Sequence, residues 1–118
     1  MVDTAVTLDA GGALINDKIW IVSTYRVQLI KMGIEKAGSV NELGRQMGYR
    51  SRVHPGWSVV QIMQGKQAFP WPRLKKLVDY LGYDMEDVLK HTTQHERVTL
   101  EGTKSALMMN GMSGYIPR

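Results

Sequence analysis

The sequence contains no cysteine and no apolar run approaching the ~18–20 residues that a bilayer-spanning helix needs. The absence of cysteine excludes a disulfide scaffold and thiolate chemistry. The first residues, Met-Val-Asp-Thr, lack the basic and apolar regions of a secretory signal. We therefore expect a cytoplasmic protein that has no membrane partner.

Acidic residues are also missing from a long central part of the chain. Residues 43–78 contain seven Lys or Arg and no Asp or Glu, whereas the rest of the chain contains eight basic and eleven acidic residues. Positive charge gathered in one segment attracts a polyanion, and nucleic acid is the most abundant polyanion. The alternative is a solvated basic face without a partner, although such faces usually carry interspersed acids.

Residues that could support catalysis are scarce. The three histidines lie outside any catalytic pattern, and no paired carboxylates border a glycine-rich loop. His91 and His95 stand four residues apart and could share a metal on one helix, but no third ligand is arranged to complete the site. We therefore expect neither an enzyme nor a bound metal or cofactor.

The spacing of apolar residues predicts one mainly helical domain over residues 18–91. The first helix is expected over residues 18–36, with residues 19–22 alternatively forming a short strand. Ser39 and Glu42 form a capping box that begins a second helix, which ends at Gly48. Gly44 lies inside this helix at a cost of about 1 kcal/mol, which indicates that another helix approaches closely there.

Three further helices are expected after a loop over residues 49–57. The third runs over about residues 57–64, with Val59 and Ile62 facing inward. The fourth begins near Pro72 and ends at Gly82, and the fifth begins at Asp84 and ends near residue 91. The sequence therefore predicts five helices separated by short connections.

The order of these helices resembles the helix-turn-helix domain of the lambda-repressor/Cro-like (XRE) family. The resemblance covers residues 25–90. It is carried by residues 42–48 as helix two, by Val59 and Ile62 followed by Gly65-Lys66 as helix three, and by Pro70 leading into residues 74–82. It implies a five-helix fold and binding of double-stranded DNA by a small transcriptional regulator, such as a repressor.

Two features depart from the family pattern. The turn before helix three is about five residues longer than usual, within residues 50–55, and closure entropy tolerates a loop of that length. In addition, Val40 stands where many relatives carry a Gln that holds the DNA backbone. One contact expected from the family is therefore missing.

The resemblance also implies which residues contact DNA. The leading residues of a recognition helix read base edges, and the basic residues around it bind phosphates. The outward positions of helix three are Ser58, Gln61 and Gln64. The basic contacts expected by position are Arg50 and Arg52 in the turn, together with Arg45, Lys66 and Arg73. Each of these residues, taken singly, is equally typical of a solvated surface.

Trp57 and Trp71 flank the third helix and have two interpretations. They could stack on exposed bases, as in single-strand binders, or they could close the ends of a small core, which we favour. The first interpretation leaves RNA or single-stranded DNA binding as an alternative function. A protein-interaction module built on the same fold is a third.

The two ends of the chain, residues 1–17 and 92–118, are expected to form arms outside the helical domain. Residues 6–9 with 13–15 are similar to residues 98–101 with 106–108, and each pair reads as a short β-hairpin. Such hairpins are marginal alone, so they would pair with each other or with a second subunit. We therefore expect a homodimer, with the last ten residues as a possible flexible tail.

Overall fold

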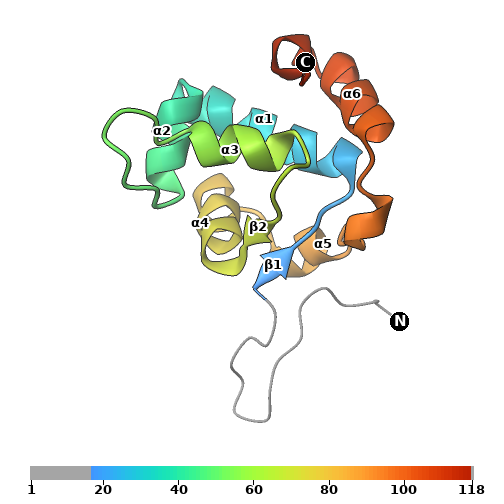
Figure 1. Ribbon diagram of the computed structural model, residues 1–118. Coiled ribbons are helices and arrows are strands. Elements are labelled where there is room, and N and C mark those ends of the chain that lie inside the picture. The colour runs from blue at the N-terminus through green and yellow to red at the C-terminus, as the bar shows by residue number, and fades with distance from the viewer. Residues whose placement is uncertain (1–16, 118) are drawn as a thin grey trace.

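The computed structural model describes residues 17–117, so the N-terminal hairpin expected over residues 6–15 lies outside the described residues. The predicted mainly α class is confirmed (Figure 1). Within residues 17–117 no helix is long and apolar enough to cross a membrane. The elements, in order, are β1 (Lys18–Ile19), α1 (Ser23–Ala37), α2 (Val40–Gln46), α3 (Trp57–Met63), β2 (Phe69–Pro70), α4 (Trp71–Leu81), α5 (Met85–Leu89), η1 (His95–Arg97), α6 (Leu100–Met109) and η2 (Ser113–Tyr115).

The first helix begins later than its apolar pattern predicts, because residues 18–21 are extended. Ile19 pairs antiparallel with Phe69 of β2, and Ile21 forms an isolated bridge with Thr92. Both isoleucines are fully buried, which suits β-branched side chains in extended backbone. The strand alternative for this stretch is therefore confirmed, and α1 follows it from Ser23.

The second helix begins as predicted. The Ser39 hydroxyl accepts a hydrogen bond from the Glu42 backbone N–H at 3.1 Å, which confirms the first half of the capping box. The Glu42 carboxylate instead pairs with Arg45 one turn further along the same helix. Leu43 and Met47 are fully buried on the inner face of the segment.

Helices α3, α4 and α5 match their predicted positions to within a few residues. Val59 and Ile62 of α3 are fully buried, as expected, and α4 carries Pro72 in its first turn. Asp84 caps α5 by accepting a hydrogen bond from the Glu86 N–H. Helix α1 contacts α2, α3, α4 and α6, so it lies at the centre of the helical assembly (Figure 1).

The hairpin predicted over residues 98–108 is wrong, because most of this stretch forms helix α6. The Thr99 hydroxyl caps the helix by accepting a hydrogen bond from the Gly102 N–H at 3.1 Å. Thr103, Ala106 and Leu107 then lie on one face at helical spacing and are buried against the core. The side chains pack along α1, and this tertiary burial outweighs the weak β pattern.

A buried arginine joins α6 to the rest of the core. Arg26 of α1 is 1% exposed, and its guanidinium donates to the Ile21 carbonyl at 2.8 Å and to the Thr103 hydroxyl at 2.9 Å. No carboxylate among residues 17–117 forms an ion pair with it. Burial lowers the pKa of Arg26 to about 10, which leaves it charged at neutral pH.

Candidate nucleic-acid interface

The end of the long turn is held directly against α2. Gly44 lies so close to the turn that a Cβ atom on it would stand 2.1 Å from the Pro55 carbonyl oxygen. On the neighbouring residue, the Gly56 N–H donates to the Asn41 side-chain oxygen at 3.0 Å. The close approach predicted from Gly44 is therefore present, and it is made by the backbone that leads into α3.

The turn itself is organised by local hydrogen bonds. The His54 N–H donates to the Ser51 hydroxyl at 3.1 Å, and the Trp57 N–H donates to the His54 carbonyl at 3.1 Å. Arg50 and Arg52 project from this turn and are exposed. Neither of them takes part in an ion pair among the described residues. Their charge is therefore presented to solvent without a neighbouring acid.

The outward row of α3 begins with a tryptophan. Because Val59, Ile62 and Met63 face the core, the helical repeat of 3.6 residues places Trp57, Gln61 and Gln64 on the opposite side. Trp57 is 57% exposed, so the expectation that it closes the core is wrong. Trp71 does pack against the core, as expected.

Two of the expected contact residues meet at Tyr49 at the base of the turn. The Arg73 guanidinium lies 4.9 Å from the centre of the Tyr49 ring and donates to the Met47 carbonyl at 3.4 Å. Burial raises the pKa of the Tyr49 hydroxyl, while Arg73 and a hydrogen bond with Ser58 act in the opposite direction. Ser58 and Arg73 are half-buried, and both contact groups of the protein itself.

The remaining expected residues are spread along the surface. Arg45 is exposed and paired with Glu42. Gln61 is half-buried in the outward row of α3. Lys66 is exposed and follows the C-terminal end of α3, whereas the turn precedes its N-terminal end. The Gln64 amide donates to the Tyr115 carbonyl at 2.8 Å and so holds the C-terminal segment against α3. Gln64 is thus occupied by an intramolecular contact.

A hollow of about 290 Å³ opens where the turn meets the start of α3. The sequence marked Arg50 and Ser58 as contacts there and gave base stacking as one of two interpretations of Trp57, but it did not single out Tyr49. The sequence feature that could have indicated this residue is the number of aromatic and basic residues in one short loop. The residues that line the hollow are Tyr49, Arg50, Ser51, His54, Pro55, Trp57 and Ser58.

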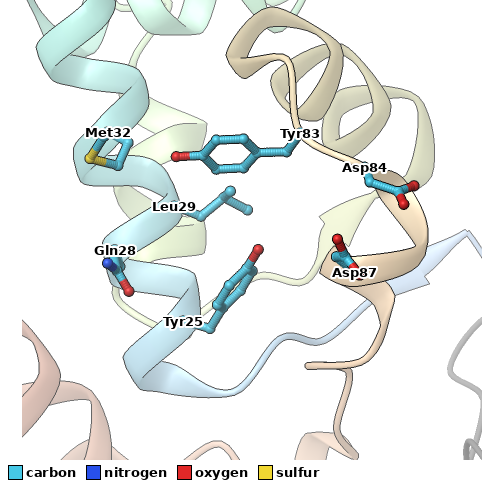
Figure 2. Close-up of a pocket in the computed structure, with 7 residues that line it drawn as sticks. All are labelled: Tyr25, Gln28, Leu29, Met32, Tyr83, Asp84 and Asp87. Atoms are coloured by element: carbon cyan, nitrogen blue, oxygen red, sulfur yellow. The ribbon is translucent and has the colours of Figure 1, made fainter.

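A second hollow, of about 360 Å³, has the opposite charge. Figure 2 shows Tyr25 and Tyr83 reaching into the space between α1 and the start of α5, with Asp84 and Asp87 at its far side. Burial raises the pKa of the Tyr25 hydroxyl, and Tyr83 and Asp87 raise it further. Tyr25 also stacks on His91, with ring centres 3.7 Å apart. This acidic hollow is unsuited to a polyanion.

The chain was compared with families, with curated proteins and with solved structures. No protein-family model matches it, and neither a curated protein nor a solved structure matches it significantly. The chemistry available to the described residues is therefore the basis for assigning a function. The turn and α3 combine unpaired positive charge, an exposed aromatic ring and amide side chains, which together suit a polyanion that carries bases.

Proposed function

We propose that the protein binds double-stranded DNA through α3 and the basic turn before it, as a small transcriptional regulator of the lambda-repressor-like class. The observation that carries the proposal is the pair of exposed arginines, Arg50 and Arg52, which have no carboxylate partner among the described residues. A charge kept free of acids beside an exposed helix suits a phosphate backbone.

The roles of individual residues follow from their surroundings. Arg50 and Arg52 bind phosphates beside the groove that receives α3, and Gln61 reads a base edge, preferably adenine. Lys66 adds a phosphate contact at the other end of the helix. Arg45 joins in only if its exposed ion pair with Glu42 opens, which costs little because exposed pairs are weak.

Two such units on one palindromic site would require a homodimer. Met108 and Met109 of α6 are 64% and 78% exposed and offer apolar surface to a second copy. Occupancy of the site, with phosphates fixing the register, is the proposed mechanism of regulation. Sedimentation analysis of the free protein and of its DNA complex measures the number of subunits.

The decisive experiment is the binding of labelled duplexes by the purified protein, preceded by selection of bound sequences from a random pool. If about five phosphates are engaged, affinity falls by roughly two to three decades between about 50 and 200 mM salt. The double variant Arg50→Gln/Arg52→Gln should reduce both affinity and the salt slope. The matched control Lys90→Gln/Arg97→Gln removes the same charge from exposed positions around α5 and η1 and should leave both unchanged.

Three results would count against the proposal. Binding that does not depend on salt excludes a phosphate-based mechanism. Equal losses in the two double variants indicate that total charge, rather than the turn, attracts DNA. A stronger affinity for single strands than for duplexes assigns the protein to the alternative class.

A further inference from the structure

The hollow in the long turn has features that groove reading does not use. Groove reading uses side chains that project outward, whereas this hollow is a concave site beside Trp57, the first residue of the outward row of α3. Its lining includes the buried Pro55 and the exposed Arg50, His54 and Trp57. The extra residues of the turn thus create a concave site in addition to joining α2 to α3.

The chemistry of this site suits a flat aromatic group that carries a phosphate. Tyr49 and Trp57 supply aromatic rings, and Trp57 leaves more than half of its surface to solvent, at 57%. Bases stack on such rings whatever their sequence. Arg50 supplies a cation that has no acidic partner among the described residues, and a guanidinium binds phosphate well.

The size of the hollow limits the ligand. Pockets for drug-sized molecules occupy ~300–1,000 Å³, and this hollow has about 290 Å³. It lies at the lower limit of that range, so it suits a ligand of about the size of one nucleotide better than a larger cofactor. An intact duplex does not offer a single base to such a site, because its bases are stacked and paired.

The aromatic residues are held in place before any ligand arrives. Arg73 covers the Tyr49 ring at 4.9 Å, and Ser58 hydrogen-bonds to the same tyrosine. The backbone of Trp57 is fixed by its bond to the His54 carbonyl at 3.1 Å. The Tyr49 side chain therefore loses little freedom when a ligand binds, whereas for Trp57 only the backbone position is set in advance.

We propose that the hollow binds one unpaired nucleobase, stacked on Trp57, with its phosphate at Arg50. This inference rests on the proposed function and adds to it a preference for nucleic acid that contains an unstacked base. Such a base comes either from a bulge in a duplex or from a single strand. The chemistry at the hollow is the same in both cases.

The test compares three fluorescently labelled DNA probes of one sequence: a perfect duplex, the same duplex with one unpaired adenine, and the single strand. Stacking one base on an aromatic side chain strengthens binding by about five- to 150-fold. We expect the bulged duplex to bind at least fivefold more tightly than the perfect duplex. Trp57→Leu should abolish this preference, so that the ratio of the two affinities falls to about one.

Two further variants separate stacking from general effects. Trp57→Phe keeps an aromatic ring and should retain part of the preference. Tyr83→Leu removes a ring that is 40% exposed but lies in the acidic hollow, so this variant should retain the full preference for the bulged duplex. Circular dichroism of each variant checks that the helices remain, which is expected because Trp57 and Tyr83 lie outside the buried core.

The outcomes distinguish this inference from the proposed function. Equal binding of perfect and bulged duplexes, unchanged by Trp57→Leu, overturns the base site and leaves duplex binding intact. Tightest binding of the single strand, lost in Trp57→Leu, supports the base site and overturns the duplex assignment. A protein that binds none of the three probes overturns both.

Discussion

Among the described glycines, Gly44 is the one at which an added Cβ would meet the turn backbone most closely, and replacing this glycine with alanine tests the importance of that approach. In a solvent-exposed helix, Gly→Ala stabilises by about 1 kcal/mol because alanine has the higher helix propensity. Here the new Cβ would stand 2.1 Å from the Pro55 carbonyl oxygen and 2.4 Å from its carbonyl carbon. Both atoms belong to the backbone, so neither can rotate away.

The magnitude follows from what must move. Restoring an ordinary contact requires the turn to retreat by about 1 Å, which disturbs the bond from Gly56 to Asn41 as well as the start of α3. Overpacking costs about 1–3 kcal/mol and the lost hydrogen bond about 1 kcal/mol, against a gain of about 1 kcal/mol in propensity. We expect Gly44→Ala to lower the free energy of unfolding by about 1–3 kcal/mol.

Urea denaturation followed by circular dichroism measures this difference, with two variants for comparison. In Gly33→Ala the new Cβ would meet the ends of flexible side chains, of which Leu43 Cδ1 is the nearest at 2.8 Å, so the loss of stability should be smaller. In Gly114→Ala no atom lies within 4 Å, so the change should stay within about 0.5 kcal/mol. A Gly44→Ala protein as stable as the parent would refute the argument, because it would mean that the turn is free to move.

Three further substitutions test other parts of the structure by the same denaturation assay. Arg26→Met leaves the Ile21 carbonyl without its hydrogen-bond donor but also removes a buried charge. We expect a net loss of about 2 kcal/mol in the free energy of unfolding, and a gain in stability would contradict the described network. Ser39→Ala removes the cap of α2 and should cost about 1 kcal/mol, whereas an unchanged midpoint would show that the cap is not formed. Leu107→Ala should cost about 2–5 kcal/mol if α6 belongs to the core, and a loss below about 0.5 kcal/mol would place α6 outside it.

The helices from α2 to α5 could be predicted because their boundaries are set by local chemistry. Ser39 and Asp84 cap helices through their own side chains, and each bond spans only two or three residues. The apolar spacing of Leu74, Leu77 and Val78 likewise fixes the buried face of α4 without information from elsewhere. Each of these signals can be recognised from a few neighbouring residues of the sequence.

The errors concern places where distant segments decide the outcome. Residues 98–108 have a weak β pattern, but the Thr99 cap and burial of Leu107 against α1 make them helical. Trp57 belongs by size in a core, yet the turn places it at the start of α3, where its ring faces solvent. Gln64 appears available in the sequence, and its bond to Tyr115 joins residues 51 positions apart. The Gln64–Tyr115 bond and the exposure of Trp57 leave no periodic trace in the sequence, whereas Thr99 and the helical spacing up to Leu107 were local signals for α6.

The separation of charge within the molecule constrains how the proposed complex forms. Arg50 and Arg52 project from the turn, whereas Asp84 and Asp87 border the hollow at α5. Figure 1 shows the turn between α2 and α3 at a different side of the helical assembly from α5. Exposed charges that lie farther apart than the Debye length, about 8 Å in physiological salt, are largely screened from one another. In the proposed complex, a polyanion would be attracted at the turn and repelled at α5, which would orient the protein with the aromatic hollow toward DNA before they touch.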